Sequence, residues 1–151
     1  MYIDELIEKA KQIGYTKIPE PLPTILLREI EVENIVRQTL ANDGFSVVPR
    51  VREQGVDIIA RKNGKEMYIE VEGNKKPDGV NPLTTSQKYT HYFRAIGQLT
   101  FRISEYVNGE FILALPEDEY YRDKVSKTLH AFRKLGVIVY FVTESGFEVI
   151  K

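Results

Sequence analysis

The chain has no cysteine among its 151 residues. This absence excludes disulfide frameworks, thiolate metal sites and cysteine nucleophiles together, and it is consistent with a reducing compartment. No apolar run approaches the roughly 20 residues that a membrane-spanning helix needs. The first residues also lack the basic-then-apolar order of a signal peptide. We therefore expect a cytoplasmic protein without a membrane partner.

Several catalytic motifs are missing as well. The chain contains no GxxxxGK[ST], no GxGxxG after a predicted strand and no GxSxG, so P-loop, Rossmann and α/β-hydrolase functions lack support. Its two histidines, His91 and His130, are too few for a zinc constellation. The formal net charge is −1. This value neither favours nor excludes nucleic-acid binding, because the charges of an acidic site and a basic rim can cancel in the sum.

The length and composition of the chain fit one globular domain, preceded by a short N-terminal segment. Residues 1–23 combine apolar residues at helical spacing with a connector stiffened by three prolines. They predict an extra N-terminal helix and its linker. Residues 24–151 are expected to form the α/β domain itself.

The α/β domain is predicted from alternating helical and extended patterns. Helices are expected over 24–40, 87–107 and 118–135, and strands over 45–51, 55–61, 66–73, 111–115, 137–143 and 147–150. Thr24 is expected to cap the first of these helices, and Gly44 and Gly136 to follow helix ends. The order predicts a mixed central sheet flanked by helices.

The most informative local signal is a hairpin. Asn63-Gly64 between two apolar runs predicts a two-residue type I′ turn. Counting outward from that turn places Asp57 directly opposite Glu70. One face then collects the apolar side chains Val56, Ile58, Ala60, Met67, Ile69 and Val71, and the other collects Asp57, Glu70 and Glu72, with Ile59 and Tyr68 nearer the turn.

The opposed carboxylates predict a metal site. Like charges directly opposite each other destabilise a hairpin unless a positive group lies between them. A divalent cation satisfies this requirement, since Mg²⁺ commonly takes one or two carboxylates with water and phosphate. The alternative is a solvated polar face whose acids are neutralised by Lys or Arg from elsewhere.

In these hairpin residues the chain resembles the PD-(D/E)XK, or restriction-endonuclease-like, nuclease superfamily. The matching strings are GVDII at 55–59 and YIEVEG at 68–73. The resemblance implies a helix, three-stranded meander, helix, strand core and Mg²⁺- or Mn²⁺-dependent hydrolysis of phosphodiesters. It implies that Asp57 and Glu70 hold the metal, with the backbone carbonyl of Val71 as a further ligand.

Two further stretches fit the same family. Glu33 precedes Leu40 and Gly44-Phe45 in the order typical of the first core helix, so it would face the site. The stretch AIGQL at 95–99, followed by Arg102, is typical of the helix after the meander and marks Gln98. Together they also resemble the small XisH-type controlling-factor proteins of cyanobacteria. The competing interpretations are a plain i,i+4 ion-pair row for Glu33 and the solvated side of an amphipathic helix for Gln98.

One residue departs from the family pattern. The third motif position usually holds Lys, and here it holds Glu72, an E-X-E variant. Glu72 would act as general base or bind a second metal, or Lys75 or Lys76 would supply the missing cation. A catalytically inactive relative is the remaining alternative.

Basic and aromatic residues near the hairpin suggest contacts to nucleic acid. Lys75, Lys76, Arg94 and Arg102 are candidates for phosphate contacts. Of the aromatic residues at 89–101, Phe93 and Phe101 are expected in the core rather than stacked on bases.

We therefore expect metal-dependent cleavage of nucleic acid, with DNA as the expected substrate, by Asp57, Glu70 and Glu72, assisted by Glu33 and Gln98. The second hypothesis is a non-catalytic nuclease-fold protein that binds nucleic acid or a protein partner in DNA processing or recombination. The third is an interaction module with a solvated acidic face. Many relatives are dimers, so a homodimer is an open expectation.

Overall fold

The computed structural model describes residue 8 and residues 24–50 and 55–151. The predicted leading helix and connector at 1–23 lie outside the described residues, except for Glu8, which is helical. In chain order the elements are α2 (Glu29–Asn42), β1 (Ser46–Val47), β2 (Ile58–Lys62), β3 (Lys65–Val71), α3 (Thr85–Glu105), β4 (Glu110–Pro116), α4 (Glu119–Leu135), β5 (Val137–Thr143) and β6 (Gly146–Ile150).

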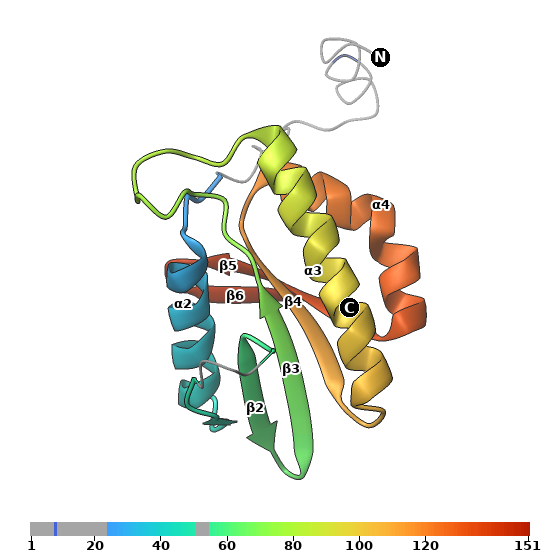
Figure 1. Cartoon of the computed structure of the whole chain (residues 1–151). Helices are drawn as coiled ribbons and strands as arrows, with labels where there is room; N and C mark the ends of the chain where they lie inside the picture. The colour runs from blue at the N-terminus through green and yellow to red at the C-terminus, as the bar shows by residue number, and fades with distance from the viewer. Residues whose placement is uncertain (1–7, 9–23, 51–54) are drawn as a thin grey trace.

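The predicted α/β class with a mixed sheet is confirmed. The sheet has the strand order β1-β2-β3-β4-β5-β6, in which β4 pairs parallel with β3 and β5, and the other neighbours pair antiparallel. Parallel neighbours need a crossover connection, and α3 and α4 provide the two crossovers. Figure 1 shows α3 and α4 side by side, with α2 apart from them across the strands. Within the described residues, no helix is long and apolar enough to cross a bilayer.

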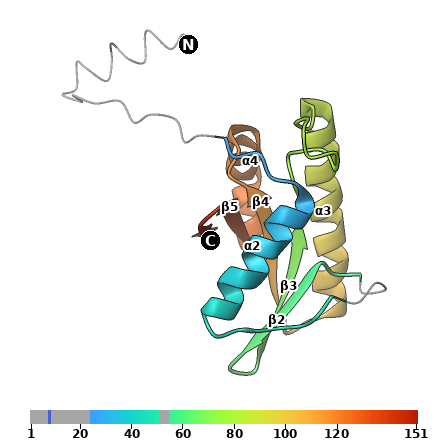
Figure 2. The ribbon, with the colours of Figure 1, turned by 90° about the vertical axis from the view of Figure 1, so that its left-hand side faces the viewer.

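Two apolar layers hold this arrangement together, one on each face of the sheet. On one face α2 packs on side chains that include Ile58, Ile69 and Ile112. On the other face α3 and α4 pack on a layer that includes Leu113 and Phe141. Because both faces are covered, β4 is buried along nearly its whole length, which matches the apolar composition of parallel strands. Figure 2 shows α2 lying on the side of the strands away from α3.

The predicted hairpin is confirmed in turn type and register. Asn63 and Gly64 have φ values of 52° and 77°, as a type I′ turn requires. The ladder pairs Lys62 with Lys65 and continues to Ile58 opposite Ile69. The alternation within β3 therefore turns Ile69 and Val71 toward α2, and Glu70 toward α3.

The face assignment is wrong for Val56. Val56 packs in the layer under α3 rather than with Ile58 in the layer under α2, because β2 begins only at Ile58 and strand alternation does not extend to residues before it. The face that carries Glu70 and Glu72 is also not solvated. Both carboxylates are buried, so the third hypothesis of a merely solvated acidic face does not hold.

The predicted start of the first core helix is wrong as well. The helix begins at Glu29, not after Thr24. The preceding residues are held extended, because the Ile25 N–H donates to the Glu117 carbonyl at 2.7 Å and the Leu27 N–H donates to Asn74 Oδ1 at 2.8 Å. The predicted strand at 45–51 shortens to β1, and residue 51 lies outside the described part.

The other helix ends follow their local signals. Thr84 caps α3, because its hydroxyl oxygen accepts from the Gln87 N–H. In return, the Gln87 side-chain oxygen accepts from the Thr84 N–H. This capping box starts the helix two residues before the predicted position. Asp118 caps α4 through the Tyr120 and Tyr121 N–H groups. Gly136 closes α4 with a φ of 74°, as predicted for a left-handed C-cap.

Candidate active site

Buried carboxylates gather where β3 ends between α2 and α3. Glu70 and Glu72 expose only 2% and 4% of their surface. Gly73 follows them at a point where a Cβ atom would lie 2.5 Å from the backbone nitrogen of Glu29. Only glycine permits so close an approach, and this approach brings the start of α2, with Glu29 and Glu33, to the carboxylates of β3.

Asp57 and Glu70 meet as the hairpin register predicts. Asp57 Oδ2 accepts the Val71 N–H at 2.8 Å, and the Asp57 carboxylate is close enough to Glu70 for its charge to act on that group. Burial raises the pKa of Glu70, and the negative charge of Asp57 raises it further. Arg102 opposes both effects, with Nε 3.4 Å from Glu70 Oε1.

Arg102 is itself fixed from three sides. Besides Glu70, its guanidinium contacts Glu105 Oε2 at 3.2 Å and donates to the carbonyl of Gly55. This last bond ties α3 to the residues just before β2. The predicted phosphate-binding role of Arg102 therefore competes with a role in which it neutralises Glu70.

Glu72, the residue at the position of the family's Lys, pairs with a histidine from α3. Its Oε2 lies 3.0 Å from Nδ1 of His91. Burial raises the pKa of Glu72 to about 8, with a further contribution from the charge of Glu29. Burial also lowers the pKa of His91, and the Arg94 charge adds to this shift. One proton shared between Glu72 and His91 satisfies both groups.

Glu33 faces the site, and it is also the ion-pair partner that the spacing predicts. It exposes 2% of its surface, and its two oxygens pair with Arg37 Nε at 3.0 Å and Arg50 Nη1 at 3.0 Å. Arg37 also donates to the backbone carbonyls of Val48 and Asp57, at 2.8 and 2.9 Å. Glu33 therefore orders an arginine that holds the backbone of Asp57 in place.

The donor set can be compared with what a metal ion needs. In the described part of the chain, no group of three or more His, Cys, Asp or Glu side chains is arranged to hold a metal. Asp57 and Glu70 are neighbouring carboxylates, and the pKa of Glu70 is raised by burial and then by the charge of Asp57. They fit the smaller requirement of Mg²⁺, which commonly takes one or two carboxylates. Val71, the predicted carbonyl ligand, lies between Glu70 and Glu72 and is buried.

The remaining predicted residues lie on the loop after β3 and on α3. Lys75 and Lys76 follow β3 in a loop that is closed by a bridge between Lys75 and Pro82. Arg94 and Gln98 are exposed on α3. Their positions at i and i+4 place them on the same side of the helix as Arg102.

The expectation that Phe93 and Phe101 lie in the core is wrong. They expose 41% and 71% of their surface, and Tyr89 exposes 54%. Tyr92, Ala95 and Leu99 form the buried side of α3 instead. The apolar pattern of this helix is wider than the stripe that its neighbours cover.

Three residues at the site were not singled out from the sequence as part of it. Glu29 lies one turn before Glu33, so the i,i+4 row contained a signal for it. His91 lies one turn before Arg94 on α3, which is a weaker signal. Arg50 had no local signal, because its contact with Glu33 joins a loop to a helix 17 positions earlier.

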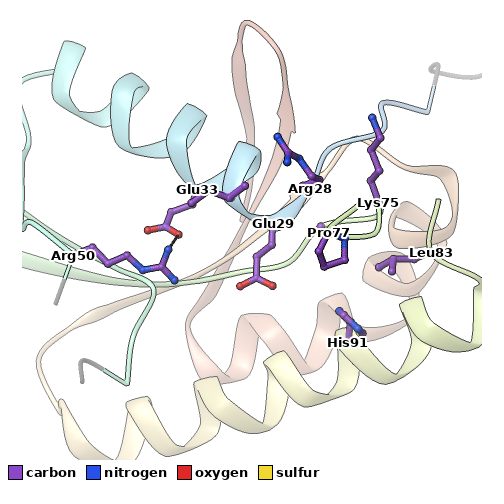
Figure 3. Close-up of a pocket in the computed structure, with 10 residues that line it drawn as sticks. Arg28, Glu29, Glu33, Arg50, Lys75, Pro77, Leu83 and His91 are labelled. Atoms are coloured by element: carbon purple, nitrogen blue, oxygen red, sulfur yellow. Dashed lines mark ion pairs between the residues drawn. The ribbon is translucent and has the colours of Figure 1, made fainter. Parts of the chain in front are cut away.

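A cavity of about 270 Å³ is lined by the acidic residues Glu29 and Glu33 and by His91, the partner of Glu72. It lies between α2, α3 and the loop after β3, and Figure 3 shows its labelled residues. The Glu33–Arg50 ion pair stands at one end, Pro77 and Leu83 stand at the other, and Glu29 lies between them.

Comparison with known proteins supports the fold. No protein-family model and no curated protein matches the chain. Two solved structures are similar. One is an XisH family protein from Nostoc punctiforme, which has 14% identity over 80% of this chain and 99% of that chain, with a TM-score of 0.52. The other is an fdxN element excision controlling factor protein from Anabaena variabilis, which has 18% identity over 81% of this chain and 99% of that chain, with a TM-score of 0.54. At these identities the likeness shows a shared fold, in line with the predicted resemblance to XisH-type proteins.

Proposed function

We propose that this protein is a metal-dependent nuclease that hydrolyses phosphodiester bonds of nucleic acid, with DNA as the expected substrate. The observation that carries the proposal is that the buried Glu70 carboxylate on β3 lies beside the carboxylate of Asp57, which is half-buried just before β2. Burying one acid next to the charge of another is costly without a cation. This cost supports the proposal that the pair binds a cation.

In the proposed mechanism, the residues of the site would bind the metal, accept a proton and orient the base. Asp57 and Glu70, with the Val71 carbonyl, would hold Mg²⁺ or Mn²⁺, which supplies Lewis-acid polarisation of the phosphodiester when bound. Glu72 would accept the proton of the attacking water, since a general base works best with a pKa near the working pH and burial raises its pKa to about 8. His91 would orient Glu72 through their 3.0 Å contact.

Cationic and polar side chains would position the strand. Arg94 lies near Glu72, and Arg94, Lys75 and Lys76 would contact phosphates. Gln98, next to Arg94 on the exposed side of α3, would contact the backbone of the same strand. These contacts would hold the phosphodiester without adding sequence preference.

The names of the two similar structures are consistent with DNA processing. One is an excision controlling factor protein of the fdxN element, and the other belongs to the XisH family. Because the shared fold does not carry an activity by itself, the proposal depends on the carboxylates and not on the likeness.

A second function is favoured by one feature of the site. Arg102 and His91 already pair with Glu70 and Glu72, and such pairs can neutralise buried acids without a metal. A non-catalytic protein of this fold, binding nucleic acid or a protein in recombination, would keep the same pairs.

Cleavage assays separate the two functions. Supercoiled, linear duplex and single-stranded DNA would be incubated with Mg²⁺ or Mn²⁺, beside EDTA and the Asp57→Asn variant. The nuclease predicts cutting that is lost in EDTA and in Asp57→Asn but retained in Glu105→Gln, a matched carboxylate that contacts Arg102 outside the site. Binding of DNA that persists in Asp57→Asn, with no cutting of any of the three substrates, would favour the non-catalytic function.

A further inference from the structure

The cavity beside the carboxylates has the size and the wall chemistry of a site for one nucleotide. Its volume of about 270 Å³ lies just below the roughly 300–1,000 Å³ that is usual for small-molecule sites. A base pair in a duplex could not enter it without leaving the stack. A single unpaired nucleotide could, at the cost of unstacking alone.

The apolar end of the cavity suits the faces of a base. Pro77, Leu83 and the ring of His91 line this end, and Figure 3 shows His91 pointing from α3 toward the other two. Histidine is among the side chains on which unpaired bases stack. The contact with Glu72 fixes the imidazole at Nδ1, so the ring is held in place before a ligand arrives.

The loop that supplies Pro77 and Leu83 is held by its own hydrogen bonds. The Leu83 N–H donates to the Asn74 carbonyl at 2.8 Å, and the Lys76 N–H donates to the Asn81 carbonyl at 2.8 Å. Asp78 accepts from the Val80 and Asn81 N–H groups. A wall formed in advance lowers the ordering cost of binding.

Glu29 is placed to contact the edge of a base in the cavity. It lies between the apolar end and the Glu33–Arg50 pair. A carboxylate accepts from the amino groups of cytosine and adenine, whereas thymine presents carbonyl groups in their place. Arg28 and Lys75 also line the cavity, and Figure 3 shows their charged ends directed away from Glu29, where neighbouring phosphates of the strand could reach them.

We propose that this cavity holds one unpaired nucleotide of the bound strand, with its base between His91, Pro77 and Leu83 and its amino group on Glu29. The inference rests on the proposed function, since it takes nucleic acid as the ligand. It adds that the substrate is single-stranded or locally unpaired beside the phosphodiester, and that bases with an amino group are preferred over thymine.

The test measures binding without cleavage, in EDTA. The probes are single-stranded 12-mers with a central 2-aminopurine, adenine, cytosine or thymine, and a blunt duplex of the same length. We expect the single strand to bind roughly tenfold more tightly than the duplex, a rise in 2-aminopurine fluorescence as the base leaves its stacked neighbours, and weaker binding of the thymine probe.

Two variants and one control locate the effect. Leu83→Ala should weaken single-strand binding roughly tenfold, and Val80→Ala, in the same loop but 75% exposed, should leave it unchanged. Glu29→Gln should reduce the preference against thymine, because an amide both accepts and donates. This second variant keeps the test valid if Leu83→Ala fails to fold. Equal binding of duplex and single strand, or a base preference unchanged in Glu29→Gln, would overturn the inference.

Combination with the cleavage assays distinguishes this inference from the proposed function. Metal-dependent cutting of duplex without the fluorescence rise would support the nuclease and overturn the nucleotide site. The fluorescence rise and the Leu83→Ala effect without any cutting would support the nucleotide site and overturn the nuclease.

Discussion

At the scale of single residues, the site is a balance between buried acids and the arginines and histidine that contact them. Glu70 has Arg102, Glu72 has His91, and Glu33 has two arginines. Truncating one partner of a buried pair leaves the other charge unsatisfied. An amide of the same shape removes the charge without removing the volume, so Glu→Gln changes are the informative ones.

Glu70→Gln should leave the metal-free protein as stable as the wild type or more stable. The amide avoids the buried negative charge beside Asp57, and Arg102 keeps its contacts with Glu105 and Gly55. At pH 8.5 in EDTA we expect a gain of about 1 kcal/mol, or a rise of roughly 2–4 °C in Tm by calorimetry. Added Mg²⁺ should raise the Tm of the wild type and not of the variant. A destabilisation instead would show that the Glu70–Arg102 pair is worth more than its burial costs.

Glu72 should make the metal-free protein less stable as the pH rises. Its folded pKa is raised to about 8 from the ordinary value of 4.5, so its contribution is fully present below pH 4.5 and is lost as the pH rises through about 8. In that window the unfolding free energy should fall by at most about 1.4 kcal/mol per pH unit for this group.

The charges around Glu72 come from every element that packs against it. They are Glu29 from α2, Asp57 from the residues before β2, Glu70 from β3, and His91 and Arg94 from α3. Chemical denaturation between pH 5 and pH 9 in EDTA should show a shallower decline for Glu72→Gln than for the wild type. Parallel curves for the two proteins would contradict the raised pKa of Glu72.

At the scale of elements, α3 contributes both to the candidate site and to the core. Its site-facing side presents His91 and Arg102 to the carboxylates, its inner side packs Tyr92 and Leu99, and its outer side leaves Phe101 largely exposed. Gly97 lies within this helix although a helix interior disfavours glycine.

Gly97→Ala should stabilise the protein. A Cβ atom at Gly97 would meet no atom within 4 Å, so alanine adds helix propensity without a clash. We expect a gain of about 0.5–1 kcal/mol in the unfolding free energy, measured with urea. The matched control is Gly136→Ala, whose φ of 74° should make the same change cost about 1 kcal/mol. Loss of stability in Gly97→Ala would indicate a close contact on that face of α3 in solution.

At the scale of the whole molecule, one buried amide joins three distant segments. Asn74 accepts the Leu27 N–H at 2.8 Å and donates to the Ile25 carbonyl at 2.7 Å and to Asp118 Oδ2 at 2.9 Å. It thereby links the chain before α2, the loop after β3 and the start of α4. Lys88 of α3 completes the cluster with a 2.7 Å contact to Asp118.

Asn74→Ala should destabilise the whole domain. The change leaves buried polar groups without partners, each costing about 1–3 kcal/mol, so we expect a loss of about 3 kcal/mol in total by denaturant unfolding. Asn81→Ala, at an exposed asparagine in the same loop, should cost less than about 0.5 kcal/mol. Equal effects of the two changes would show that the cluster does not hold the segments together.

The sequence alone predicts what depends on near neighbours. The Asn63-Gly64 turn, the register that sets Asp57 beside Glu70, the Gly136 helix end and the order of elements all follow from alternation, turn residues and capping within a few positions. The ion pair between Glu33 and Arg37, which the i,i+4 spacing predicts, is present in the structure.

What depends on distant contacts was decided only by the tertiary structure. The extended chain before Glu29, which was expected to be helical, is held by residues 47 to 92 positions away. The burial of Glu72 and its pairing with His91 depend on how α3 lies across the sheet. The cavity lined by Glu29, Pro77 and Leu83 exists only where three elements meet. The physical reason is that backbone geometry and side-chain alternation act over a few residues, whereas burial and the pKa shifts that it causes depend on packing across the whole fold.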